Sequence, residues 1–223
     1  TGNVWRADRP QRGRFRQFRQ CDIDILGDES SLAEIELISA TSTFLGKAGF
    51  KNFTIRINDR RILKAMAEYA GFPAESYDTV FIILDKMDKI GREGVKAELV
   101  EAGFDADACE KYLELMCSLG NDAQTVSALP GMLDGHLDNA ISDELSYIMN
   151  SAMAAKNADF NIEFDPTLVR GMSYYTGPIF EIIMNDFGGS VGGGGRYDEM
   201  IGKFTGNPVP ACGFSVGFER IIM

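Results

Sequence analysis

The chain has 223 residues, of which 45% are hydrophobic and 25% are charged, which is typical of a globular protein. No apolar run approaches the ~18 residues needed to cross a membrane, and the start lacks a signal-peptide pattern, so no membrane partner is expected. The single histidine, His136, and four scattered cysteines without zinc spacing exclude a histidine-rich metal site and favour a reducing cytoplasm. Thr1 is not an initiator methionine, and we therefore expect a fragment or a processed product.

The net charge of −11 is unevenly distributed along the chain. Residues 1–20 carry six arginines against one aspartate, a net charge of +5, so the rest of the chain carries −16. Because guanidinium groups match phosphate and carboxylate, this patch indicates a local anion site rather than a broad duplex-binding surface. The alternative is a disordered basic arm, against which the interleaved Trp5, Phe15 and Phe18 argue.

The first elements form a predicted β-hairpin. Residues 4–8 can form a strand, and residues 9–14 form a loop punctuated by Pro10 and Gly13. The return strand, 18–25, alternates cleanly between two faces. One face holds Cys21, Ile23 and Ile25, and the other holds Phe18, Gln20, Asp22 and Asp24.

Helices and a strand follow the hairpin. Ser31 and Glu34 match a capping box and predict the start of a helix. A strand is predicted over 51–57, and Asp59 can cap a helix over 60–70.

Residues 73–157 lack strand signals and read as a helical insertion. The charged string 84–90 within it could be a binding face, but we expect it to be a solvated helix face. The predicted helices cover 78–90, 92–102, 105–119, 122–128 and 136–156.

Strands resume at 161–164 and 179–184, and a glycine-rich run at 188–195 leads into Arg196. Glycine there permits close approach of the backbone to a ligand, but the run lacks the order of a P-loop. The last segment, 211–220, predicts a strand that runs into a helix, with Arg220 in its first turns.

The most informative stretch is residues 170–177, Arg-Gly-Met-Ser-Tyr-Tyr-Thr-Gly. It places one cation and two aromatic hydroxyls on a turn, which suits a planar polar ligand beside an anion. It resembles the histidine-binding signature of histidyl-tRNA synthetases, Arg-Gly-Leu-Asp-Tyr-Tyr-Thr-Gly. Met172 and Ser173 depart from that signature.

The resemblance extends over essentially the whole chain. The hairpin, with its loop 9–14 and return strand 17–25, resembles motif 2 of class II aminoacyl-tRNA synthetases. The segment 213–220 resembles motif 3, and Gly195-Arg196-Tyr197-Asp198 matches the second histidine-specific signature. The helical block lies where these enzymes carry an insertion domain.

The resemblance implies an α+β fold with a class II synthetase-like antiparallel sheet flanked by helices and an inserted all-helical lobe. The implied domains are a first part of the catalytic core at 1–72, the insertion at 73–157, and the second part of the core at 158–223. The implied reaction is attack of the histidine carboxylate on the α-phosphate of ATP, followed by transfer of the histidyl group to the 3′ end of histidine tRNA. Mg²⁺ would accompany ATP, and the full-length enzyme is expected to be a cytoplasmic homodimer.

The resemblance also implies the site residues. Arg6 and Arg170 would be the catalytic arginines at the α-phosphate. Phe18 would stack on adenine with Arg220 on the other ring face, and Asp8 would read the adenine edge. The remaining residues are Arg14 and Arg16 at the outer phosphates, and Gln20, Asp24, Arg170, Tyr174, Tyr175 and Tyr197 for histidine. No protein side chain is assigned to a metal.

Motif 1 is expected upstream of Thr1 and the anticodon-binding domain downstream of Met223, so we expect the fragment alone to be weak or inactive. One alternative is a synthetase-like, histidine-binding regulatory subunit of ATP phosphoribosyltransferase. Retention of Arg6, Arg170 and Arg220 argues against it. Another alternative, a generic nucleic-acid-binding hairpin, leaves the tyrosine turn unexplained.

Overall fold

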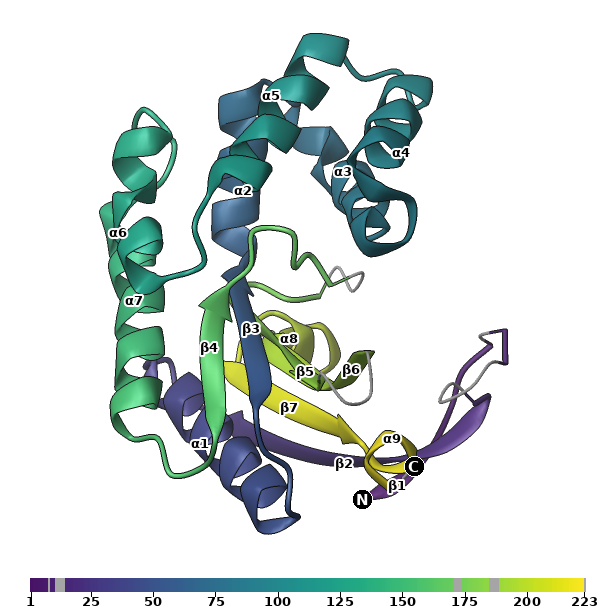
Figure 1. Ribbon diagram of the computed structural model, residues 1–223, viewed down its shortest axis with the longest axis vertical. Coiled ribbons are helices and arrows are strands. Elements are labelled where there is room, and N and C mark those ends of the chain that lie inside the picture. The colour runs from purple at the N-terminus through teal and green to yellow at the C-terminus, as the bar shows by residue number, and fades with distance from the viewer. Residues whose placement is uncertain (8, 11–14, 171–173, 185–188, 223) are drawn as a thin grey trace.

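The computed structural model describes residues 1–7, 9–10, 15–170, 174–184 and 189–222. Its centre is a seven-stranded sheet with the order β1-β2-β7-β6-β5-β3-β4 (Figure 1). The strands are β1 (Gly2–Trp5), β2 (Gln17–Leu26), β3 (Phe53–Asp59), β4 (Phe160–Phe164), β5 (Pro178–Met184), β6 (Gly189–Arg196) and β7 (Ala211–Gly217).

The sheet is antiparallel except for one pair. β3 and β4 run parallel, with Phe53 opposite Phe160, whereas every other neighbouring pair is antiparallel. A parallel pair needs a long crossover, and the helices between residues 60 and 154 supply it. The expectation of an antiparallel sheet flanked by helices is thus confirmed, with this one addition.

Most of the helices occupy the predicted regions, but the short helical segments at 74–76 and 200–205 were not predicted. Asp59 caps α2 (Arg60–Ala70) by accepting a hydrogen bond from the Arg61 backbone N–H at 2.8 Å, as the sequence predicted. The other helices are α1 (Leu32–Lys47), the 3₁₀ turn η1 (Ala74–Ser76), α3 (Tyr77–Leu84), α4 (Met87–Glu101), α5 (Ala106–Ser118), α6 (Ala123–Met132), α7 (Asn139–Ala154), α8 (Met200–Thr205) and α9 (Phe218–Ile222).

Residues 73–157 contain helices joined by turns and short loops, with no strand among them, as predicted. Their helices form two groups: α5 packs against α2, and α4 packs against α3 and α5, whereas α6 and α7 run beside the sheet, with α7 packed against α1 (Figure 1). The predicted helix over 78–90 is divided into α3 and α4 by a turn at Asp85 and Lys86. The domain boundaries at 72 and 157 stay a prediction.

The hydrophobic core lies between the sheet and its helices. Phe53, Ile55 and Ile57 of β3 are at most 1% exposed, because their alternate positions all point into it. The rings of Phe180 and Phe214 stack across β5 and β7 with centroids 5.8 Å apart. Among the described residues, no helix is both long and apolar enough to span a membrane.

Candidate active site

A cavity of about 910 Å³ opens on one face of the sheet. Strands β2, β6 and β7 form much of its wall, and further lining residues come from the segment before β5 and from 84–89, at the end of α3 and the start of α4. It brings together these predicted site residues: Arg6, Phe18, Gln20, Asp24, Arg170, Tyr174, Tyr175, Tyr197 and Arg220. Arg16 is exposed and is not part of the lining, and Asp8 and Arg14 lie outside the described residues.

Cations and an aromatic ring lie together at the hairpin end of the cavity. The guanidinium of Arg6 lies over the Phe18 ring, 3.9 Å from its centroid. Arg220, in the first turn of α9, donates from Nη1 to the Ser190 carbonyl of β6. The neighbouring Glu219 accepts a hydrogen bond from the Arg19 backbone N–H at 2.7 Å, which ties α9 to β2.

Arg170 has a backbone conformation that is unusual for a residue other than glycine, because its φ is 54°. Its Nη1 lies 2.8 Å from Oε1 of Glu181 on β5, an ion pair at the cavity wall. The backbone just before it is anchored, since Asn58 Nδ2 donates to the Leu168 carbonyl at 3.0 Å. Gly193 of β6 leaves room for this guanidinium, because a Cβ there would lie 2.4 Å from Arg170 Nη2 and 2.7 Å from the Phe180 carbonyl oxygen.

Two adjacent tyrosines follow Arg170 along the wall. The ring centroids of Tyr174 and Tyr175 are 4.5 Å apart, and their hydroxyl oxygens are 3.5 Å apart. Burial, assisted by the neighbouring Tyr174 hydroxyl, raises the pKa of Tyr175. Tyr175 therefore stays a neutral hydroxyl, able both to donate and to accept a hydrogen bond.

Opposite these tyrosines, Tyr197 donates from its hydroxyl to Asp24 Oδ1 at 2.5 Å. Burial and the hydrogen bond to Asp24 both raise the pKa of Tyr197. The pair spans three strands across Gly213, where a Cβ would lie 2.0 Å from Asp24 Oδ1. On the same face of β2, Gln20 Nε2 donates to Ser215 Oγ at 2.7 Å.

The turn between α3 and α4 contributes lining residues that the sequence did not predict. We expected 84–90 to be a solvated helix face, and Asp85, Asp88 and Lys89 are exposed. They also line the cavity, Asp85 from the turn after α3 and the other two from the first turn of α4. Arg56 and Asp165, an ion pair at 3.2 Å, also line the cavity and were likewise missed, because nothing local distinguishes them from surface charges.

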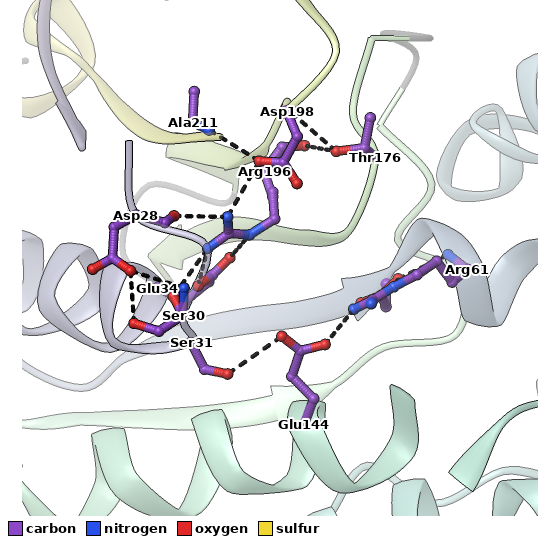
Figure 2. A network of polar contacts seen from close by, with 11 residues as sticks. Asp28, Ser30, Ser31, Glu34, Arg61, Glu144, Thr176, Arg196, Asp198 and Ala211 are labelled. Atoms are coloured by element: carbon purple, nitrogen blue, oxygen red, sulfur yellow. Dashed lines mark hydrogen bonds and ion pairs between the residues drawn. The ribbon is translucent and has the colours of Figure 1, made fainter. Parts of the chain in front are cut away.

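Behind the cavity wall lies a buried ion pair between Arg196 and Glu34 (Figure 2). The predicted capping box is therefore wrong: Ser31 stands at the start of α1, but its side chain makes no cap hydrogen bond. Glu34 instead accepts two hydrogen bonds from Arg196, at 2.5 Å and 2.8 Å. A bidentate bond to a buried guanidinium outweighs a bond to one helix-end N–H. Ser31 donates to Glu144 of α7 at 3.3 Å.

A metal-binding cluster is absent from the part of the chain that the structure describes. No group of three or more His, Cys, Asp or Glu side chains gathers there in a way that could hold a metal ion.

The site contains three features. Its arginines can bind an anion, and its aromatic ring can stack on a flat ring. A second, polar pocket holds a hydroxyl that is hydrogen-bonded to a carboxylate. An antiparallel sheet that carries these groups on a hairpin and on a strand running into a helix defines the catalytic core of a class II aminoacyl-tRNA synthetase. The sequence model of the histidyl-tRNA synthetase family matches residues 1–221. The chain belongs to that family.

Curated relatives agree with this assignment. The histidine–tRNA ligase of Leifsonia xyli is 51% identical over 98% of this chain, and that of Aeropyrum pernix is 38% identical over 99%. Among solved structures, histidyl-tRNA synthetase from Nostoc sp. PCC 7120 superposes with a TM-score of 0.82 at 26% identity, over 99% of this chain and 52% of that one. The chain spans 52% and 50% of the two curated relatives, about half their length.

Proposed function

We propose that the protein containing this chain is a histidine–tRNA ligase, and that the cavity described above activates histidine with ATP. The observation that carries the proposal is the convergence of Arg6, Arg170 and Arg220 on the cavity that also holds the Asp24–Tyr197 pair. Three guanidinium groups suit the phosphates and carboxylate that react. A pocket with paired polar groups suits an imidazole.

In the proposed reaction, the histidine carboxylate attacks the α-phosphate of ATP and pyrophosphate leaves. Such a transfer depends mainly on positioning and on charge stabilisation. Arg6 and Arg170 are the proposed catalytic residues, one from each side of the cavity. Once the adenylate has formed, a hydroxyl at the 3′ end of histidine tRNA would attack its carbonyl carbon, so that the histidyl group passes to the tRNA and AMP leaves.

The proposed nucleotide contacts lie at the hairpin end. Adenine would stack on Phe18, with Arg220 on its other face, and this would require Arg6 to move from the Phe18 ring toward the phosphates. Asp8, Arg14 and Arg16 remain proposed contacts to the nucleotide. Mg²⁺ would arrive on the ATP phosphates, as is usual for this ion.

The proposed histidine contacts are Gln20, Asp24, Arg170, Tyr174, Tyr175 and Tyr197. Asp24 is a hydrogen-bond acceptor and the neutral tyrosine hydroxyls act as donor or acceptor, so the pocket can satisfy both imidazole nitrogens. An amino acid without those nitrogens would leave polar groups of the pocket unpaired. A dimeric, cytoplasmic full-length enzyme is part of the proposal, and the free state of all four cysteines supports a reducing compartment.

The second candidate is a histidine-binding regulatory subunit. A solved structure titled as an ATP phosphoribosyltransferase regulatory subunit/histidyl-tRNA synthetase, from Bacillus halodurans, has a TM-score of 0.79. At 24% identity that likeness concerns the fold alone. The nucleotide side of the cavity, with Arg6, Phe18 and Arg220, favours the ligase.

The test is calorimetric binding of a non-hydrolysable sulfamoyl analogue of histidyl-adenylate to this chain. The analogue occupies both halves of the proposed site, and we expect it to bind at least about tenfold more tightly than histidine. Histidine binding without binding of ATP or of the analogue would favour the regulatory subunit. Equal binding of the corresponding seryl analogue would contradict histidine specificity.

A further inference from the structure

Arg196 adjoins Tyr197 in the chain but points to the other face of the sheet. It ends β6, opposite Cys212 of β7, and only 6% of its surface is exposed. Because successive side chains of a strand alternate, Tyr197 enters the cavity while Arg196 enters the layer beneath α1. Because the two residues are adjacent, a shift of the Arg196 backbone would also shift the position of the Tyr197 side chain.

The guanidinium of Arg196 is fully engaged (Figure 2). Nε and Nη2 donate to the two carboxylate oxygens of Glu34 on α1, which is itself 0% exposed. Nη2 also donates to the Ser30 carbonyl at 3.1 Å, and Nη1 donates to the Asp28 carbonyl at 3.1 Å and to Asp198 Oδ1 at 3.2 Å. All five N–H groups of the guanidinium therefore donate hydrogen bonds. Although burial alone opposes the charge, Glu34 raises the pKa of Arg196, so the guanidinium stays charged.

The residue on the other side of Tyr197 is held by the same network. Asp198 Oδ1 accepts from Arg196 and from the Ala211 backbone N–H at 2.9 Å, and the Asp198 N–H donates to Thr176 Oγ1 at 3.1 Å. The Tyr197 N–H donates to the Ala211 carbonyl at 2.7 Å. The backbone of Tyr197 is therefore held in place by the hydrogen bonds of the residues on either side of it, Arg196 and Asp198.

We propose that Arg196 and Glu34 are a positioning pair for the histidine pocket, which hold the Tyr197 hydroxyl on Asp24. The pair touches neither the cavity nor a ligand, and it acts through the strand it immobilises. The role in histidine recognition rests on the proposed function, whereas the role in placing Tyr197 does not. Burying two charged groups costs desolvation free energy, so the pair is not explained by stability alone, and this points to a role in fixing the geometry of the strand.

The experiment compares Arg196→Lys and Glu34→Gln with a matched control. Lysine keeps the charge but loses the planar fork. The control is Arg61→Lys, which alters a second bidentate pair, Arg61–Asp59 at 3.0 Å and 2.6 Å, outside the cavity. Tyrosine labelled with ¹³C at Cζ reports the hydrogen bond of each phenol by NMR, and Tyr197→Phe assigns the relevant signal. Calorimetry measures histidine and ATP binding, and circular dichroism checks the fold.

We expect both Arg196→Lys and Glu34→Gln to move the Tyr197 signal toward that of a free phenol, and Arg61→Lys to leave it in place. Loss of a good hydrogen-bond geometry should weaken histidine about tenfold, with ATP changed less than about twofold. If the single variants fail to fold, the double variant Arg196→Met/Glu34→Leu removes both charges and is read in the same way.

A folded variant whose Tyr197 signal does not move would overturn the proposal, as would an equal shift in Arg61→Lys. Failure of the proposed function looks different. In that case the unaltered chain binds no histidine, while the Tyr197 signal still responds to the Arg196 and Glu34 substitutions.

Discussion

The Tyr197 hydroxyl and the Asp24 carboxylate meet at 2.5 Å although 173 positions separate them in the chain. They lie on opposite sides of β7, and Gly213 leaves the space through which they bond. The pocket therefore depends on Asp24 of β2, on Gly213 of β7 and on Tyr197, which directly follows β6. Substitutions at these positions can test the arrangement.

Asp24→Ala should weaken histidine selectively. Removal of the acceptor leaves the Tyr197 hydroxyl and an imidazole N–H without a partner, at a cost of about 1–3 kcal/mol in histidine binding. Calorimetry with histidine and with ATP measures both affinities. Asp22→Ala, on the same face of β2, is the control and should leave histidine affinity near that of the unaltered chain. An equal loss of ATP affinity in Asp24→Ala would assign Asp24 to the nucleotide half instead.

Gly213→Ala should damage the same pocket from the middle strand. The new Cβ would lie 2.0 Å from Asp24 Oδ1 and 3.2 Å from Tyr197 Cε1, so the carboxylate must move. We expect histidine affinity to fall at least about tenfold, as for loss of a hydrogen bond to a charged group. Gly189→Ala, on β6, is the matched control because nothing lies within 4 Å of its added Cβ. Unchanged histidine binding in Gly213→Ala would show that the pocket does not use Asp24 where it stands.

Arg170→Ala in the complete enzyme should lower the rate of adenylate formation by two or more orders of magnitude. That scale corresponds to one lost charge contact in the transition state, about 3 kcal/mol. Histidine-dependent exchange of pyrophosphate into ATP measures it. Arg56→Ala is the control, since Arg56 also lines the cavity and pairs with a carboxylate, Asp165. A similar loss in both variants, or a loss of fold in Arg170→Ala, would contradict a specific role.

Tyr112 should make the fold sensitive to alkaline pH. This residue is 0% exposed, and burial raises the pKa of its phenol well above the usual value of about 10. The folded chain therefore keeps a proton that the unfolded chain releases above pH 10. The free energy of unfolding should consequently fall as pH rises through that range, by up to about 1.4 kcal/mol per pH unit for this group.

Tyr112→Phe should reduce that fall, whereas Tyr147→Phe should not, because Tyr147 is 53% exposed. Urea unfolding at several pH values between 8 and 11 measures the slope. Identical slopes in the two variants would show that Tyr112 is not the residue that titrates.

The sequence alone determined much of the local structure. Alternation over 18–25 predicted that Phe18, Gln20, Asp22 and Asp24 share a face, and all four line the cavity. Asp59 was predicted to cap α2, and it does. The Arg-Gly-Met-Ser-Tyr-Tyr-Thr-Gly string pointed to the family that the comparisons then showed. These features are readable because each depends on a backbone period or on a motif spanning a few neighbouring residues.

Only the tertiary structure decided which distant groups meet. Glu34 matched a local capping pattern, but its partner is Arg196, 162 positions away, because a buried guanidinium competes more strongly than a helix-end N–H. Asp85 and Lys89 are solvated charges, as expected, but their position at the cavity follows only from the packing of the helices against the rest of the chain. The parallel pairing of β3 and β4 depends on a crossover of about a hundred residues. In each case the deciding energy comes from contacts between elements, which no local pattern encodes.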